Sequence, residues 1–319
     1  MNKIQNYKIN SEWIISKRGK KNKVDPFKPY AYLVEKERTV SGSIEDTATV
    51  FLTNSECPFS CLMCDLWKNT TDRPVPIGAI PKQIEWALEN LSPAKHLKLY
   101  NSGNFFDKNA IPKEDYQRIA ELVSGFETLI IENHPKLINE NCLRFRDMLK
   151  PELQIAMGLE TVHPEILKKL NKKNTLGDFA NSVQYLGKNG IKSRAFILLR
   201  PPFMSEEEGV YWAKKSIDFA FEVGVECCIV IPVRPGNGVI DFLMEKGGFK
   251  LPSIQSLEFV LEYGIGLKSG RVFADVWDLN LFSNCDTCIN QRIERLNTMN
   301  MNQKIISEVD CSCTVARQG

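Results

Sequence analysis

Apolar and polar positions alternate along most of the chain in two regular patterns. Short apolar runs typical of buried β-strands recur at residues 47–52, 96–101, 128–133, 153–160, 191–199 and 225–232. Segments with apolar residues at helical spacing follow these runs, at residues 81–91, 112–125, 139–149, 163–171, 176–190 and 205–224. Strands that alternate with helices in this way predict βα units and a parallel sheet.

The number of units narrows the fold. Six units are fewer than the eight of a closed TIM barrel, so the pattern predicts an α/β protein with a partial (βα)6 TIM-type barrel over residues 46–236. In such a barrel, ligands bind at the C-terminal ends of the strands. Residues 1–45 are polar, and we expect an irregular N-terminal extension there. Residues 237–319 interrupt the alternation and are expected to form a cysteine-bearing C-terminal subdomain, with a helix over 256–268 and a strand over 271–277.

Composition and charge limit the classes of function. The chain has 319 residues, 43% hydrophobic residues and a formal net charge of +2, which does not favour a nucleic-acid or membrane-surface binder. No apolar run approaches the roughly 20 residues that a membrane-spanning helix needs, and the N-terminal segment lacks the apolar stretch of a signal peptide. We therefore expect a cytoplasmic protein. The basic run at residues 17–23 is either a solvated segment or a contact for an anionic substrate such as RNA.

Three cysteines lie in one short loop directly after the predicted strand 47–52. Cys57, Cys61 and Cys64 have the spacing C-x3-C-x2-C. A closed zinc site normally has a fourth protein ligand, and Asp65, the neighbour of Cys64, is poorly placed to be one. An iron–sulfur cluster held by three cysteines leaves one iron open to another ligand. Zinc and an iron–sulfur cluster are both chemically sensible here, and the missing ligand favours the cluster.

This loop, in its place after the first strand of a partial barrel, resembles that of the radical S-adenosylmethionine (SAM) superfamily. The resemblance implies that Cys57, Cys61 and Cys64 hold a 4Fe–4S cluster whose fourth iron binds SAM. Reductive cleavage of SAM would then give a 5′-deoxyadenosyl radical that abstracts hydrogen from a substrate. The superfamily usually has an aromatic residue before the third cysteine, near the adenine. Here that residue is Met63, whose thioether could fill the same place.

Further SAM contacts are implied by the ends of later strands. The stretch "YNSGNFFD" at residues 100–107 matches the superfamily's glycine-rich turn, so Ser102, Gly103 and Asn104 are expected near the SAM amino group. In "GLETVHPEILKKLNK", Glu160 takes the position that meets the SAM ribose. Arg194 is expected to meet the SAM carboxylate. An ordinary turn, a helix-terminal carboxylate and a surface ion pair are the plain alternatives for these positions.

Candidate substrate contacts also follow strand ends. Polar side chains expected at the barrel mouth are Asp107, Glu132, His134, Arg200, Arg234 and Asn237. A structural histidine and surface ion pairs are equally plausible interpretations for the histidine and the arginines.

Four more cysteines occur near the C-terminus. Cys285, Cys288, Cys311 and Cys313 form a C-x2-C and a C-x-C pair, a pattern typical of a four-thiolate metal site. A second 4Fe–4S cluster and a structural zinc both fit, and the tight C-x-C pair slightly favours the auxiliary cluster that radical SAM proteins often carry. The remaining cysteines are expected in the core.

The reaction beyond SAM cleavage stays open, as oxidoreductase, transferase or lyase chemistry. A narrower likeness is to the group allied to the archaeosine synthase radical SAM subunit, the elongator radical subunit and the coproporphyrinogen dehydrogenases, carried by "LYNSGNFFD", "ENHP", "GLETVHP" and "RPGNG". It implies modification of a tRNA base as one alternative. A small-molecule substrate is another, and a non-enzymatic metal-binding structural protein is a third. An enzyme of this kind also requires an electron donor such as flavodoxin or ferredoxin.

Overall fold

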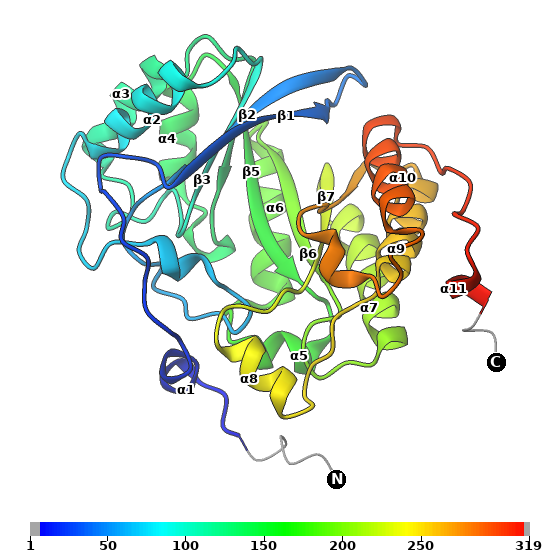
Figure 1. Cartoon of the computed structure of the whole chain (residues 1–319). Helices are drawn as coiled ribbons and strands as arrows, with labels where there is room; N and C mark the ends of the chain where they lie inside the picture. Colours follow the sequence, from blue (N-terminus) through cyan, green and yellow to red (C-terminus); the bar gives the residue numbers. More distant parts are fainter. Residues whose placement is uncertain (1–6, 316–319) are drawn as a thin grey trace.

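A single curved sheet forms the centre of the molecule (Figure 1). The computed structural model describes residues 7–315. The strands are β1 (Ala31–Arg38), β2 (Ile44–Leu52), β3 (His96–Asn101), β4 (Thr128–Glu132), β5 (Glu152–Glu160), β6 (Lys192–Leu199), β7 (Cys227–Pro232) and β8 (Arg271–Ala274). Strands that follow each other in sequence are neighbours in the sheet. β1 pairs antiparallel with β2, and all the other pairs are parallel.

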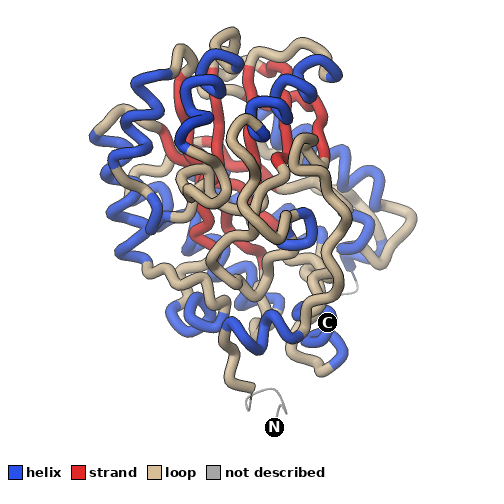
Figure 2. The backbone as a smooth tube through the Cα atoms, turned by 90° about the vertical axis from the view of Figure 1, so that its left-hand side faces the viewer, coloured by secondary structure: helices blue, strands red, loops and turns tan. Residues whose placement is uncertain are grey.

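Helices cover the outer face of this sheet, while loops and short helices gather beyond one end of the strands (Figures 1 and 2). The α-helices are α1 (Ser11–Ser16), α2 (Ala79–Asn90), α3 (Tyr116–Leu122), α4 (Glu140–Met148), α5 (Pro164–Lys169), α6 (Leu176–Lys188), α7 (Glu206–Glu222), α8 (Val239–Glu245), α9 (Ile254–Leu267), α10 (Ile289–Asn302) and α11 (Ser312–Val315). The 3-10 helices are η2 (Leu66–Asn69), η3 (Lys113–Asp115), η4 (Pro135–Leu137) and η5 (Leu279–Phe282). Capping boxes begin α6 and α7 and define where these helices start.

The predicted partial barrel is confirmed, because β2 to β7 are the six expected parallel strands. The expectation that residues 1–45 are irregular is wrong, since they contain α1 and β1. β1 looks polar in the sequence because it carries Glu35 and Glu37. In the fold, both carboxylates pair with Lys98 of β3. The strand expected at 271–277 is β8, which is shorter than predicted and extends the same sheet. The sheet therefore continues beyond both ends of residues 46–236.

The two faces of the strands differ in chemistry. Side chains that point outward are apolar and buried against the helices, as for Val50, Leu99, Ile155 and Ile197. Their burial follows the period-two alternation of a strand and supplies most of the core. The inward face is polar near the start of the parallel strands and carries aromatic rings nearer their ends.

A buried ion network fills the inside of the barrel near the start of the parallel strands. Glu37 lies 2.6 Å from Lys98 and 2.7 Å from Arg194, whose Nε also donates to Gln154 at 3.0 Å. Burial alone would raise the pKa of Glu37, but the charges of Arg194 and Lys98 hold it well below its usual value. These charges are paired and hydrogen-bonded, as buried charges must be.

The same end of the barrel brings the two sheet edges together. Arg271 of β8 pairs with Glu226 at 2.7 Å and donates to the backbone oxygen of Arg38 at the end of β1. Arg38 in turn donates to the backbone oxygen of Met301 in α10 at 3.2 Å. Side-chain contacts and α10 thus bridge the open side at this end.

A second apolar cluster lies beyond the C-terminal ends of the strands. It joins Ile14 of α1, Ile166 of α5, Ile240 of α8 and Leu62 of the cysteine loop. Full burial of a leucine side chain contributes about 1.5–3 kcal/mol, so Leu62 anchors the loop between its cysteines. Among the described residues, no helix has the length and apolar character that crossing a bilayer needs.

Candidate functional site

The loop that carries Cys57, Cys61 and Cys64 follows β2 at the C-terminal end of the barrel and is held by backbone from a later unit. The backbone N–H of Leu62 donates to the carbonyl of Leu170 at 2.9 Å. The side-chain amide of Asn171 donates to the carbonyl of Ser60 at 2.8 Å. Asn171 has a left-handed backbone with φ of 54°, which asparagine tolerates better than most residues. The turn after α5 therefore fixes the loop at one position between its first two cysteines and at another between its second and third.

Asn237, expected as a substrate contact, instead binds the cysteine loop. Its Nδ2 donates to the carbonyl of Leu62 at 2.8 Å and to that of Cys64 at 3.3 Å, while its Oδ1 accepts from the backbone N–H of Ile240 at 2.7 Å. The side chain is almost completely buried. Because all of these partners are backbone groups, we assign Asn237 to holding the loop rather than to binding substrate.

Cys61 is buried, Cys57 and Cys64 are partly buried, and burial sets the chemistry of all three thiols. It raises the pKa of Cys57 and Cys64, and it raises that of Cys61 to about 12, although the charge of Lys172 acts in the opposite direction. Asn104 donates to the sulfur of Cys57 at 3.2 Å. A buried thiolate requires a cationic partner, and three such soft donors fit an iron–sulfur cluster.

A buried ion pair lies next to these thiols. Nζ of Lys172 is 2.7 Å from Oε1 of Glu160, and both side chains are about nine-tenths buried. Glu160 ends β5 with φ of 67°, after a shift in register that begins at Gly158. A Cβ on Gly158 would lie 2.0 Å from Oε1 of Glu160 and 2.5 Å from Nζ of Lys172, so any larger residue there would displace this ion pair. A strained backbone around a buried charge pair is typical of functional sites.

His134 also supports the cysteine loop. Its ring stacks on Phe59 with 3.9 Å between centroids, and Nε2 lies 3.0 Å from the carbonyl of Lys172. Nδ1 accepts from the backbone N–H of Lys136 at 3.1 Å, so the proton of the neutral ring lies on Nε2. Burial, followed by the nearby charge of Lys172, lowers the pKa of His134 to about 4. Both nitrogens have backbone partners, which favours the structural interpretation of this histidine over the substrate interpretation.

Polar side-chain atoms without protein partners face the same region. Within residues 7–315, both amide atoms of Asn101, the hydroxyl of Ser102 and Oδ1 of Asn54 are buried and lack a hydrogen-bond partner. A Cβ on Gly103 would lie 3.0 Å from Nδ2 of Asn54 and 3.3 Å from Nδ2 of Asn101. Unsatisfied buried polar groups are rare and costly, so this cradle beside Cys57 fits a polar ligand such as the methionine part of SAM.

Aromatic rings and one carboxyl group line the inside of the barrel at its mouth. Phe51, Tyr100 and Phe196 form a chain of ring contacts at 6.1–6.2 Å, and Trp277 lies 6.0 Å from Phe51. Glu132 ends β4 and pairs with Ala156 of β5. Burial raises its pKa to about 8, although the backbone N–H of Asn101 and the charge of Lys172 oppose this. Glu132 thus remains a candidate substrate contact able to exchange a proton near neutral pH.

The three arginines named from the sequence are engaged elsewhere. Arg194 lies in the ion network at the other end of the barrel, so the structure does not bring it to the cysteine loop. Arg200 pairs with Glu206 and donates to the carbonyl of Leu251 at 2.7 Å. Arg234 pairs with Asp275 at 2.9 Å and also binds the carbonyl of Trp277. Their donors hold connecting segments in place, and we correct their assignment from ligand contacts to structural residues.

Two other named residues lie close to the cysteines. Met63 is half-buried against the apolar cluster of Leu62. Asp107 accepts from the backbone N–H of Asn109 at 2.9 Å and shapes the turn that follows Asn104. Both positions are compatible with the contacts expected of them.

The four C-terminal cysteines come together as predicted. All four sulfurs of Cys285, Cys288, Cys311 and Cys313 lie within 4.8 Å of one another, so the group could hold a metal. Cys285 belongs to the segment after η5, Cys288 precedes α10, and the other two lie at α11.

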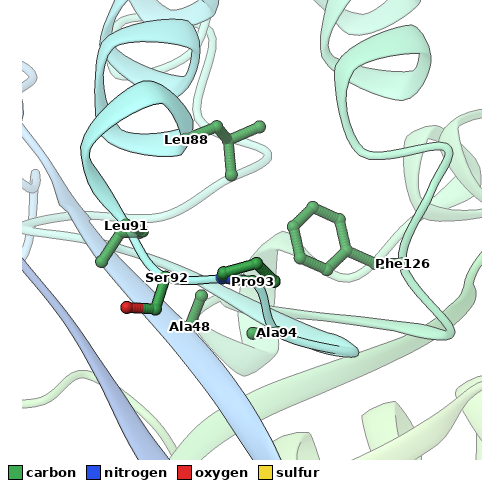
Figure 3. Close-up of a pocket in the computed structure, with 7 residues that line it drawn as sticks. All are labelled: Ala48, Leu88, Leu91, Ser92, Pro93, Ala94 and Phe126. Atoms are coloured by element: carbon green, nitrogen blue, oxygen red, sulfur yellow. The ribbon is translucent and has the colours of Figure 1, made fainter.

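A surface hollow of about 260 Å³ lies elsewhere, at the end of α2. Figure 3 shows its lining, which consists of Ala48, Leu88, Leu91, Ser92, Pro93, Ala94 and Phe126. These residues offer neither charges nor thiols. The hollow lies near the start of β2 and β3, away from the cysteine loop.

Sequence reasoning missed part of the site. No role was assigned from the sequence to four residues of the site, Lys172, Asn171, Asn101 and Asn54. Asn171 and Lys172 belong to the stretch that ends "LNK". A lysine or an asparagine is common on surfaces, and only the fold shows that these four are buried beside the thiols.

Comparisons with known proteins agree with the fold. No protein-family model matches the chain. An uncharacterised protein of Methanocaldococcus jannaschii is 26% identical over 98% of this chain and 93% of its own length. Archaeosine synthase subunit beta of Methanosarcina acetivorans is 24% identical over 86% of this chain and 84% of its own length. The same subunit of Thermococcus kodakarensis is 29% identical over 44% of this chain and 46% of its own.

Two solved structures share the architecture. Elp3 of Methanocaldococcus infernus has a TM-score of 0.55 and 16% identity, over 79% of this chain and 62% of that one. SuiB of Streptococcus suis bound to S-adenosylmethionine has a TM-score of 0.52 and 15% identity, over 70% of this chain and 49% of that one. The chain thus spans less than two thirds of either structure. The chain is thus similar in fold to Elp3 and SuiB and similar in sequence to archaeosine synthase subunit beta, and its three-cysteine loop after β2 resembles that of the radical S-adenosylmethionine superfamily.

Proposed function

We propose that the protein is a radical SAM enzyme in which Cys57, Cys61 and Cys64 hold a 4Fe–4S cluster. The single observation that carries this proposal is the partly buried three-thiol loop beside a cradle of unpartnered polar groups. When bound, the cluster and SAM supply one-electron chemistry that activates a C–H bond of the substrate. The protein's own contribution is to hold, orient and shield these groups.

Each residue near the loop has a proposed part in that task. Asn104 donates to the sulfur of Cys57 and orients it. Lys172 places a positive charge beside the thiolates and is itself balanced by Glu160. Asn101 and Ser102, with Gly103 leaving room, would bind the polar groups of SAM. Their buried donors and acceptors are otherwise unsatisfied, which supports this assignment.

The substrate would enter at the mouth of the barrel. Phe51, Tyr100 and Trp277 offer an aromatic surface there, and Glu132 offers a carboxyl group whose pKa lies near neutral. Asp107 and Met63 remain proposed contacts for substrate and adenine. Glu160 keeps its proposed place near the ribose only through the position of its backbone, because its carboxylate is bound by Lys172.

The experiment that tests this proposal measures cofactor binding. Protein reconstituted anaerobically with iron and sulfide is reduced, and its electron paramagnetic resonance spectrum is recorded with and without SAM. The proposal predicts a cluster signal that changes on adding SAM. Ser102→Ala combined with Asn101→Ala should keep the signal but require at least tenfold more SAM for the change. Ser269→Ala, at an exposed position, is the matched control. An unchanged SAM requirement would remove Asn101 and Ser102 from the site, and a spectrum that ignores SAM would overturn the proposal.

Modification of a tRNA base is the second candidate function. The specific observation that favours it is the name shared by two sequence relatives, archaeosine synthase subunit beta. The basic run also lies beside the cysteine loop, because Arg18 pairs with Glu56 and Lys21 lies 3.2 Å from both Glu56 and Asp72. Two of its other lysines, Lys20 and Lys23, are exposed.

Binding of tRNA can be measured at several salt concentrations. A tRNA substrate predicts a mobility shift whose affinity falls steeply with salt, and a shallower salt dependence for Lys20→Ala/Lys23→Ala. Lys188→Ala/Lys192→Ala, on another face, would be expected to leave the slope unchanged. No shift at low salt would favour a small-molecule substrate.

We also propose that the protein works in the cytoplasm with a donor such as flavodoxin or ferredoxin, and that the C-terminal cysteines bind a metal centre.

A further inference from the structure

The four C-terminal thiols are packed as two close pairs. Sγ of Cys285 lies 3.7 Å from Sγ of Cys311, and Sγ of Cys288 lies 3.5 Å from Sγ of Cys313. All four sulfurs are within 4.8 Å of one another. The residues come from two segments of chain that are more than twenty residues apart, so the fold itself assembles the group.

These distances match one metal ion rather than a cluster. Four thiolates at about 2.3 Å from one tetrahedral ion lie about 3.8 Å from each other. In a 4Fe–4S cluster each thiolate binds a different iron, so the body of the cluster separates the sulfurs further. Cys57, Cys61 and Cys64 show the difference. They lie in the described part of the chain, yet their sulfurs do not form a group within 4.8 Å.

We propose that Cys285, Cys288, Cys311 and Cys313 bind a single tetrahedral Zn²⁺ ion and not a second iron–sulfur cluster. The C-x-C spacing slightly favours an auxiliary cluster, but the distances between the sulfurs favour structural zinc. The proposal rests on the geometry of these four residues and holds whether or not the first loop carries a cluster.

The surroundings suit a thiolate-bound ion. Arg292 donates from Nε to the sulfur of Cys288 at 3.3 Å, which is the kind of outer hydrogen bond that orients a metal ligand. Arg292 also pairs with the buried Glu258 of α9, so its position is fixed.

The ion would join the chain end to the barrel mouth. Residues 275–285 run from β8 to the first ligand, and this segment carries Trp277 next to Phe51 of β2. Arg234 holds its other end through Asp275. The ligands at 311 and 313 fix the chain after α10 to the same point. Zinc is redox-inert, so the site holds this segment in place and does not transfer electrons.

Metal analysis of two variants tests the inference. A Cys57→Ala/Cys61→Ala/Cys64→Ala protein keeps only the C-terminal group and is reconstituted anaerobically with iron, sulfide and, separately, zinc. We expect about one zinc per chain and no iron or acid-labile sulfide. Cobalt added in place of zinc should give the absorption bands of a tetrahedral thiolate complex. Uptake of four irons with sulfide by this variant would overturn the proposal, and so would a lack of any metal.

The complementary variant addresses folding and disulfides. Cys311→Ser/Cys313→Ser changes residues near the chain end, and Ser312→Ala between them is the matched control. The first should lose its zinc and keep its capacity for iron at the other loop, with a lower thermal midpoint. The control should keep both metals. Counting free thiols before and after chelation distinguishes a metal site from two disulfides, and oxidised pairs in freshly purified anaerobic protein would contradict the proposal.

Discussion

Nζ of Lys172 lies 2.7 Å from Oε1 of Glu160, and this buried pair stands between the end of β5 and the three-cysteine loop. Its position links the barrel to the thiols, because the carbonyl of Lys172 also accepts a hydrogen bond from Nε2 of His134. The ring of His134 stacks on Phe59 of the loop. Two strand ends and one turn thus shape the floor of the site.

Breaking this pair on one side should destabilise the protein. Lys172→Met leaves the Glu160 carboxylate buried without its partner, and we expect the free energy of unfolding to fall by about 3–5 kcal/mol. Adding Glu160→Gln should recover a large part of that loss. Lys173→Met, at the exposed neighbouring position, should change it by less than about 0.5 kcal/mol. Denaturant unfolding of the four proteins measures these values. Equal stability of the two lysine variants would show that the pair is not buried as described.

Two glycine substitutions should have opposite effects. A methyl group on Gly158 would overlap Glu160 and Lys172, so Gly158→Ala should cost about 1–3 kcal/mol of unfolding free energy. Gly187 lies in α6, and a methyl group added there would meet no heavy atom within 4 Å. Gly187→Ala should therefore be neutral or add about 0.5–1 kcal/mol. The comparison uses thermal or denaturant unfolding. A harmless Gly158→Ala would argue against the close approach of Gly158, Glu160 and Lys172.

Mild acid should act on the fold through His134. Its pKa in the folded protein is about 4, below the ordinary 6.5, so the unfolded chain binds more protons between these values. The stability present above pH 6.5 is therefore lost as the pH falls toward 4, by about 2 kcal/mol between pH 7 and pH 5. Unfolding measured at both pH values should show this loss in the wild type and a smaller one in His134→Gln. Identical pH dependence in the two proteins would mean that the ring is not buried in its neutral form.

Replacing Arg194 should lower the stability of the protein without changing its affinity for SAM. Arg194→Met should lower the unfolding free energy by about 3–5 kcal/mol, because Glu37 loses a buried partner. Binding of SAM to the folded, reconstituted variant should be unchanged within about twofold, since the residue lies at the far end of the barrel. Calorimetric titration checks the second statement. A large loss of SAM affinity at unchanged stability would restore Arg194 to the cofactor site.

The sequence was sufficient to predict the six parallel strands, because their outward faces are continuous runs of buried residues such as Val50 and Ile197. It did not reveal β1 as a strand, since Glu35 and Glu37 look like surface residues until Lys98 and Arg194 are placed opposite them. Parallel strands contact each other across long stretches of chain, and these pairings cannot be read from local patterns.

The site shows the same division. The cysteine spacings and the polar turn at residues 102–104 were recognisable because rare residues carry them. The roles of Arg200, Arg234 and Asn237 could not be recognised from the sequence. A position after a strand does not show whether a side chain points into the barrel or binds backbone groups of a neighbouring segment. Distances between sulfurs, which distinguish an ion from a cluster, exist only in three dimensions.

The central claim is that the loop of three thiols enables the protein to cleave SAM. The direct measurement is formation of 5′-deoxyadenosine from SAM by anaerobically reconstituted protein with dithionite. The wild type should form it, and Cys142→Ala, which removes a buried thiol outside the loop, should retain this activity. Cys61→Ala should form none above the background without protein. Production of 5′-deoxyadenosine by Cys61→Ala at the wild-type rate, or its absence from the reconstituted wild type, would contradict the account.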